Sequence, residues 1–216
     1  MTTIDDIYPV LGLRITAGPL ELRGISDADI AVLADLAGRG IHPPDQMPFS
    51  VPWTAVPAAE LPLRFARFHW GNRASFSPER WTLDLVVAWE GVVVGVQGFS
   101  TRDYLVTRTG ETGSWLGQEH QGLGIGTAMR QAMCAFLFDC LDAQEITSGA
   151  FVDNPASLAV STKVGYRPNG RHRVLRRPGE WQVNRALVLT PETFMRGAEI
   201  TVEGLGPVRR MIGLEA

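Results

Sequence analysis

Cysteine is scarce in this 216-residue chain, which holds only Cys134 and Cys140. The two lie six residues apart in a stretch with helical periodicity, about 9 Å apart along a helix axis and on different faces. A helix there excludes a disulfide between them. Because there is no Cys-x-x-Cys pair and the four histidines are scattered, no metal site is predicted.

Long apolar runs, basic excess charge and a secretory leader are also lacking. The longest apolar stretch is broken by Arg130, Gln131, Asp139 and Asp142, so no membrane-spanning segment is predicted. A net charge of −3 gives no bulk attraction for nucleic acid or anionic membranes, so neither is an expected partner. Residues 1–9 carry two adjacent acids and no basic region, which argues against a signal peptide and predicts a cytoplasmic protein.

Apolar residues make up 45% of the chain and charged residues 20%, enough to bury a core. No internal repeat or low-complexity linker divides the chain. We therefore expect one domain over residues 1–216, with a core at about 11–190 and a C-terminal extension at 191–216.

Periodicity and turn signals predict a mixed α/β domain built on a sheet. Strands are expected within 11–22, 81–89, 92–99, 112–116, 146–152, 166–175 and 182–189, and helices at 26–38, 60–70, 124–141 and 155–163. Residues 191–196 are expected to form a short helix and 200–212 a terminal strand. Residues 39–58 hold five prolines and predict an ordered, irregular loop.

The most informative stretch, residues 115–127 (Trp-Leu-Gly-Gln-Glu-His-Gln-Gly-Leu-Gly-Ile-Gly-Thr), follows a predicted strand and opens a long helix. Glycines let the backbone approach a ligand, and the amides of a helix's first turn bind anions such as a pyrophosphate. A plain glycine-rich turn is the alternative. The stretch lacks the Gly-Lys-Ser/Thr ending of a nucleotide loop, and it lies too far along the chain for a dinucleotide fold.

Four sequence blocks together resemble the GNAT superfamily of N-acetyltransferases, in particular its RimJ/RimL branch. Residues 121–126 match its Gln/Arg-x-x-Gly-x-Gly/Ala signature, and residues 154–157 (Asn-Pro-Ala-Ser) and 163–166 (Lys-Val-Gly-Tyr) match two downstream blocks. Residues 13–23 resemble its first strand pair. The resemblance implies a central, mostly antiparallel sheet with splayed parallel strands, flanked by helices. The loop at 42–53 is similar to an actinobacterial subgroup that includes succinyl-CoA users.

This resemblance implies acyl-CoA, either acetyl-CoA or succinyl-CoA, as co-substrate and no metal. The strand before the glycine loop would pair with the pantetheine arm, and an amide near Leu116 would polarise the thioester carbonyl. The residues expected to bind the cofactor are Trp115, Leu116, Gly117, Gln121, Gly122, Leu123, Gly124, Ile125, Gly126, Thr127, Asn154 and Ser157.

Asn154 and Ser157 are the expected catalytic residues, with Ser157 near the thioester sulfur. The alternatives are an ordinary helix cap for Asn154 and a solvent-facing serine for Ser157. Many relatives place a tyrosine acid at the position of Ser161, and some place a glutamate base at the position of Arg176, so both roles are unassigned. The remaining base candidates are Asp103, Glu111, Glu119, His120, Asp153 and Glu180.

The acceptor or acyl group is expected near the proline-rich loop, at His42, Asp45, Ser50 and Trp53, with Arg102, His42 and Ser50 as candidates for a succinyl carboxylate. The predicted activity is transfer of an acetyl or succinyl group to a small-molecule or peptide amine by direct attack in a ternary complex. The alternatives are a non-catalytic acyl-CoA sensor and a nucleotide-binding protein. Exposed edge strands are compatible with a homodimer or a higher homo-oligomer.

Overall fold

The computed structural model describes residues 1–215, and within them nine strands form a single sheet in the order β7-β8-β6-β5-β4-β3-β2-β1-β9. Neighbouring strands are antiparallel except β5 and β6, which are parallel. The predicted mixed, mostly antiparallel fold is confirmed. The strands are β1 (Arg14–Ala17), β2 (Leu20–Gly24), β3 (Arg80–Trp89), β4 (Val92–Arg102), β5 (Glu111–Leu116), β6 (Ile146–Phe151), β7 (Arg167–Arg177), β8 (Glu180–Leu189) and β9 (Thr201–Glu203).

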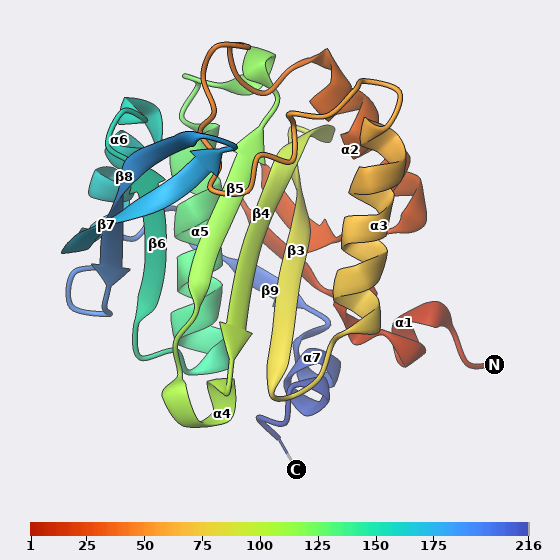
Figure 1. Cartoon of the computed structure of the whole chain (residues 1–216). Helices are drawn as coiled ribbons and strands as arrows, with labels where there is room; N and C mark the ends of the chain where they lie inside the picture. Colours follow the sequence, from red (N-terminus) through yellow and green to blue (C-terminus); the bar gives the residue numbers. More distant parts are fainter. Residues whose placement is uncertain (216) are drawn as a thin grey trace.

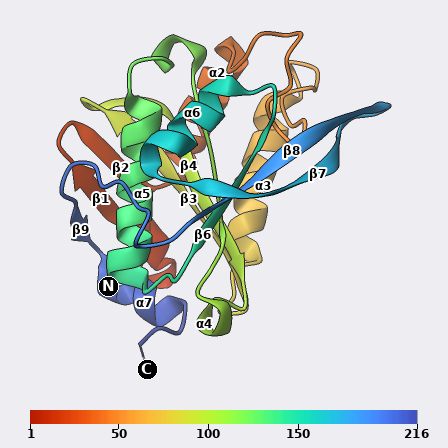
Figure 2. The same ribbon diagram turned by 90° about the vertical axis from the view of Figure 1, so that its left-hand side faces the viewer.

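Helices cover both faces of this sheet, with α2 and α3 on one face and α5 and α6 on the other (Figures 1 and 2). The hairpin of β7 and β8 projects away from the body in the turned view (Figure 2). The helices are α1 (Ile4–Ile7), α2 (Asp27–Arg39), α3 (Leu61–Ala74), α4 (Tyr104–Thr107), α5 (Ile125–Leu141), α6 (Pro155–Val164) and α7 (Leu205–Met211), with short 3-10 turns η1 (Pro9–Gly12) and η2 (Gln118–His120).

Strand β3 shows how the alternation of side chains builds two cores. Leu83 and Leu85 are fully buried in the core on the α5 face, whereas Val86 packs in the core on the α2 and α3 face. The residue between the two leucines, Asp84, also faces α3, so a carboxylate stands where the pattern would place an apolar side chain.

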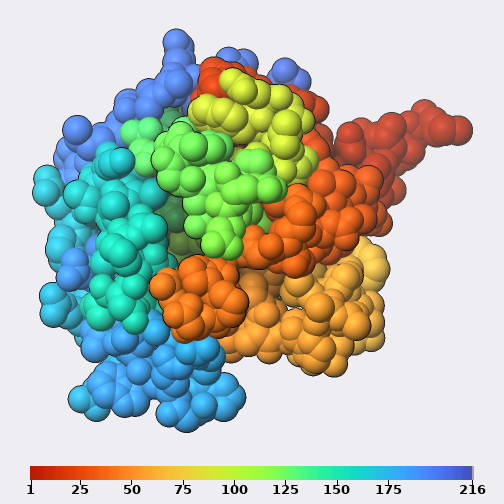
Figure 3. Space-filling view, turned by 90° about the horizontal axis from the view of Figure 1, so that it is seen from above, coloured from red at the N-terminus to blue at the C-terminus, as the bar shows by residue number. Residues whose placement is uncertain are grey.

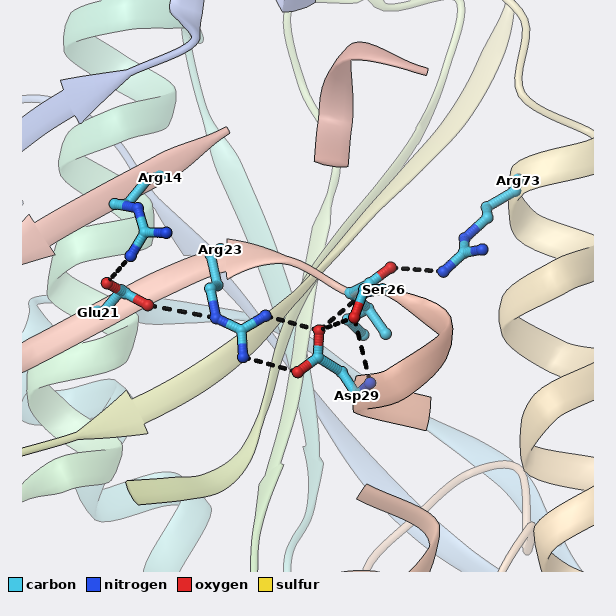
Figure 4. Close-up of polar contacts among 7 residues, drawn as sticks. Arg14, Glu21, Arg23, Ser26, Asp29 and Arg73 are labelled. Atoms are coloured by element: carbon cyan, nitrogen blue, oxygen red, sulfur yellow. Dashed lines mark hydrogen bonds and ion pairs between the residues drawn. The ribbon is translucent and has the colours of Figure 1, made fainter. Parts of the chain in front are cut away.

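A charged network fixes the start of α2 (Figure 4). The Ser26 hydroxyl caps the helix by accepting from the Asp29 N–H. The Asp29 carboxylate in turn accepts from the Ser26 N–H, and the two bonds form a capping box. Arg23 of β2 donates to both Asp29 oxygens at 2.6 Å, and Arg73 of α3 donates to the Ile25 carbonyl at 2.5 Å. Burial would raise the pKa of Asp29, but Arg23 and Ser26 outweigh it and lower that pKa. The network therefore ties β2, α2 and α3 together.

The prediction of a helix over residues 191–196 is wrong, because this segment is a single turn followed by irregular chain. The Thr190 carbonyl accepts from the Phe194 N–H at 3.1 Å, which closes the turn. The next residue, Met195, donates its N–H to the Val164 carbonyl at the end of α6, at 2.9 Å. A tertiary hydrogen bond therefore takes the donor that a longer helix would use.

The tail is not one strand over residues 200–212 but a short strand followed by a helix. Strand β9 pairs antiparallel with β1, with Arg14 opposite Glu203, and so forms the sheet edge far from β7. Helix α7 then packs its Val208 into the core on the α5 face. The C-terminal extension thus completes the sheet beside the first strands of the chain.

Candidate active site

The parallel strands β5 and β6 part soon after they meet. They are paired at one position only, Glu111 with Thr147. The Gly117 N–H donates to Val94 of β4, so the alternation of an antiparallel strand turns the N–H groups of Ser114 and Leu116 toward β6. We call the region beyond the Glu111–Thr147 pair the fork; it confirms the expected splayed parallel strands and leaves a backbone edge available to a ligand.

A buried arginine holds the closed end of the fork. Arg130 of α5 is 5% exposed and donates to the Oγ of Ser114 at 2.8 Å, the Oγ of Ser148 at 3.2 Å and the Oε1 of Gln97 at 3.4 Å. These acceptors come from β5, β6 and β4 and all are neutral. The only sign of this role in the sequence is that Arg130 is a charged residue inside an otherwise apolar predicted helix, next to Met129.

The glycine loop that follows β5 has the backbone that its sequence requires. Gly122 and Gly124 have φ angles of 75° and 86°, a region that side chains other than glycine rarely adopt. Gly124 is the N-cap of α5, and no side chain within the described residues 1–215 caps this helix. The Thr127 N–H donates to the Gly124 carbonyl at 3.0 Å, which leaves the N–H groups of Ile125 and Gly126 to bind an anion.

The remaining glycine of the motif has a different role. Gly126 lies inside α5, and a Cβ added there would meet Val160 of α6 at 3.5 Å, an ordinary contact. The approach of α5 to α6 therefore does not require a glycine at this position. Thr127 follows in the first turn, Ile125 is buried and Leu123 is 66% exposed.

Gln121 clamps the glycine loop to its surroundings. Its Nε2 donates to the Leu116 carbonyl at 2.9 Å and to the Ile41 carbonyl at 2.6 Å, so it joins the end of β5 to the start of the proline-rich loop. Gly117 packs closely as well, since a Cβ there would lie 2.6 Å from a Leu36 methyl carbon. Viewed from above, the orange loop lies against the green residues near 120, and the surface is hollowed between these and teal α6 (Figure 3).

Asn154 is the N-cap of α6, because its Oδ1 accepts from the Ser157 N–H at 3.1 Å. Ser157 is half-buried in the first turn of that helix. Ser161, at the position of the tyrosine acid in many relatives, is 1% exposed and donates to the Ser157 carbonyl at 3.0 Å. The capping interpretation of Asn154 is confirmed, and Ser161 is committed to its own helix.

The proline-rich loop forms an aromatic wall above β5. Trp53 lies 5.7 Å from Trp115 and 5.9 Å from Phe65 between ring centroids. Both nitrogens of His42 are engaged inside the loop, with the Pro43 carbonyl and the Thr54 hydroxyl, each at 2.8 Å. Asp45 and Ser50 are exposed on the same loop.

Arg102 does not join the other residues expected to hold a succinyl carboxylate. Gly95 pairs with Leu116 beside the glycine loop, whereas Arg102 pairs with Arg80 at the other end of β4. Seven residues of strand separate the two levels by about 23 Å. Arg102 therefore lies far from His42 and Ser50, and the register of the sheet explains why the expected trio does not form.

Three of the candidate bases are paired with arginines. Arg176 lowers the pKa of Asp153, and Arg177 lowers that of Glu180, which makes both carboxylates weaker bases. Glu119 lies 3.5 Å from Arg39 and 3.4 Å from His120 on the loop surface. Asp103 is at the Arg102 end of β4. Glu111 alone among the six lies where β5 and β6 part.

Comparison with known proteins agrees with this geometry. Residues 20–167 match the family model of the acetyltransferase (GNAT) domain. This match spans more than half of the chain, so the chain belongs to the GNAT family of acetyltransferases.

Solved structures show the same fold. Mycobacterium smegmatis RimJ, in complex with a coenzyme A disulfide, has a TM-score of 0.67 and 22% identity over 84% of this chain and 86% of its own. RimL, the ribosomal L7/L12 alpha-N-protein acetyltransferase, in complex with coenzyme A, has a TM-score of 0.66 and 19% identity over 80% of this chain and 94% of its own. The expected likeness to RimJ and RimL is confirmed in the fold.

A curated relative is similar over a shorter region. YdaF of Bacillus subtilis, whose assigned name is that of a ribosomal N-acetyltransferase, is 29% identical over 85 residues. These residues are 39% of this chain and 46% of YdaF, so the match spans less than half of either protein.

Within residues 1–215, two kinds of feature are absent. No group of three or more histidine, cysteine, aspartate or glutamate side chains is arranged to hold a metal ion. No helix in this part of the chain is both long and apolar enough to cross a membrane.

Proposed function

We propose that this protein transfers the acyl group of an acyl-CoA to an amine by direct attack in a ternary complex. The observation that carries the proposal is the fork, because it joins a free strand edge to a helix N-terminus with uncapped amides. A pyrophosphate needs such amides, and an amide-bearing arm such as pantetheine needs such an edge.

Each segment of the fork then has a role in the proposal. The N–H groups of residues 122–126 bind the pyrophosphate, and the edge of residues 114–117 pairs with the pantetheine arm. An N–H near Leu116, that of Ser114, which is likewise directed toward β6, donates to the thioester oxygen and stabilises the charge that develops there. Ser157 stands at the start of α6 beside the leaving sulfur, and Asn154 fixes that turn as its cap.

The cysteines support direct attack over a covalent intermediate. Burial raises the pKa of the Cys134 thiol to about 11, and this side chain lies inside the core on the α5 face. A buried thiol with a raised pKa is a poor nucleophile. The acyl group therefore passes to the amine in one transfer.

Acetyl-CoA is the donor we propose, because Arg102 is far from His42 and Ser50 and these residues do not form a carboxylate site. The names of RimL and YdaF make a peptide amine the first acceptor to test. Such an enzyme would act in the cytoplasm, where acyl-CoA is available.

Calorimetry and thiol release test the proposal. The purified protein is titrated with acetyl-CoA and succinyl-CoA and then mixed with a peptide bearing a free N-terminus, with spermidine and with a lysine derivative. We expect binding of acetyl-CoA and release of free thiol with at least one amine. Binding with no turnover on any amine would favour a sensor, and no binding of either thioester would refute the proposal.

A further inference from the structure

Asp84 belongs to a row of residues that crosses the sheet toward the fork. Asp84 of β3 pairs with Gly98 of β4, and Gly98 pairs with Gly113 of β5. Paired residues of antiparallel strands face the same side, so all three face α3. The two glycines add no side chains, and a bare strip of backbone therefore runs from Asp84 to β5.

The Asp84 carboxylate has one oxygen held and the other directed over this strip. Its Oδ2 accepts from the Asn72 amide at 2.8 Å and lies 3.4 Å from the Nδ1 of His69, both on α3. A Cβ added to Gly98 would lie 2.6 Å from the Oδ1 of Asp84, so this oxygen lies over Gly98 on the side of β5. The His69 side chain is 5% exposed and the Asp84 side chain 15% exposed.

The far end of the strip is accessible. Gly113 is exposed, and a Cβ built on it meets no atom within 4 Å. Helix α3 lies over β3, and in Figure 1 this face of β4 and β5 is uncovered below the orange proline-rich loop. Two strand spacings place the Cα atoms of Asp84 and Gly113 about 10 Å apart. An amine over Gly113 would thus stand within one water molecule of the carboxylate.

The charges around Asp84 favour the binding of a cationic group. Within residues 1–215 its ion-pair partner is His69, because Arg73 of α3 pairs with Asp27 at 2.6 Å instead. Tyr8 has a pKa raised to about 12, chiefly by burial and to a lesser extent by the charge of Asp84, and remains neutral. A carboxylate without an arginine or lysine partner can bind an ammonium group at this face.

We propose that Asp84, supported by His69, binds the protonated amine of the acceptor and takes its proton. This inference rests on the proposed function. One proton of the ammonium passes to the Asp84–His69 pair and leaves later to solvent. The nitrogen lone pair then forms the C–N bond, the C–S bond breaks with its electrons on sulfur, and a second nitrogen proton goes to the thiolate. The products are the amide and free coenzyme A.

The substitution Asp84→Asn keeps the shape of the side chain and removes its charge. We expect kcat/KM for the amine to fall about 100-fold or more at pH 7, in the range of a lost general base. The Kd for acetyl-CoA should stay within about twofold, because the fork is untouched. His69→Gln, which acts through Asp84, should lower kcat and shift the acid limb of the pH–rate profile. The exposed Asp35→Asn on α2 is the matched control.

The substitution Gly113→Ala tests the strip without touching Asp84. The new methyl group has space, so the melting temperature should be unchanged. The methyl group nevertheless covers the bare backbone between Asp84 and the fork. We expect KM for the amine to rise about tenfold while acetyl-CoA binds as before. Gly71→Ala on α3, where an added Cβ also meets nothing within 4 Å, is the control and should leave KM unchanged.

The rival carboxylate is Glu111, which is exposed beside the fork. If Glu111→Gln lost the activity while Asp84→Asn kept its rate within about threefold, the role of Asp84 would be refuted and the proposed function would stand. If the unchanged protein bound acetyl-CoA but released no thiol with any amine, both would be refuted. Loss of turnover in Asp84→Asn with intact thioester binding and an intact melting temperature supports the proposal.

Discussion

The positive φ angles of Gly122 and Gly124 make a quantitative test of the glycine loop. Alanine at either position would have to adopt a left-handed backbone, at a cost of about 1–2 kcal/mol for each residue. An added Cβ meets no atom within 4 Å at either glycine, so the cost is conformational and not steric. A variant that keeps the loop shape shows this cost as lost stability; a variant whose loop relaxes shows it as weaker binding of coenzyme A.

The two measurements together should account for the strain. We expect the loss in unfolding free energy and the loss in binding free energy to sum to about 1–2 kcal/mol for Gly122→Ala or Gly124→Ala. If the whole strain energy appears as lost binding free energy, the Kd for coenzyme A rises about 5- to 30-fold. Urea unfolding and isothermal titration calorimetry measure the two parts.

Gly126→Ala is the control within the same motif. This glycine is helical and its new Cβ makes an ordinary contact with Val160, so the variant should gain up to about 1 kcal/mol of stability and bind coenzyme A normally. If Gly126→Ala weakened binding as much as Gly122→Ala, or if neither positive-φ variant lost more than about 0.5 kcal/mol in the two measurements together, the strain reasoning would be refuted.

Three other expectations follow from the contacts described. Arg130→Met removes a buried donor from three acceptors and should cost about 2–4 kcal/mol in urea unfolding, and a change below about 0.5 kcal/mol would show that the closed end of the fork does not depend on it. Asn154→Ala should cost about 1 kcal/mol as a lost cap, whereas Ser157→Ala should lower kcat by tenfold or more with little effect on stability; equal kinetics for both variants and the unchanged protein would remove them from the site. Because Arg23 lowers the pKa of Asp29, the ion pair stabilises the fold at pH values above the carboxyl's ordinary pKa near 4. This stabilisation is lost as the pH falls through the lowered pKa. Asp29→Asn should therefore flatten the acid limb of the plot of unfolding free energy against pH.

Local signals in the sequence predicted most of the elements. Apolar periodicity gives α5, the richness in β-branched and aromatic residues gives β3 and β4, and Ser26 marks the start of α2. The glycines at 122 and 124 predicted a backbone that other residues avoid, and they have it. Each of these signals lies within a few residues of the structure that it predicts, so the chain determines it without tertiary contacts.

Non-local pairing decided the rest. The register of β5 against β6 sets where the fork begins, and the length of β4 keeps Arg102 away from the glycine loop. Asp84 meets His69 only because α3 lies over β3, and the strand register alone puts Gly98 and Gly113 in its row of the sheet. Such contacts depend on which residues of distant strands stand opposite one another, and no local preference of the chain specifies that choice.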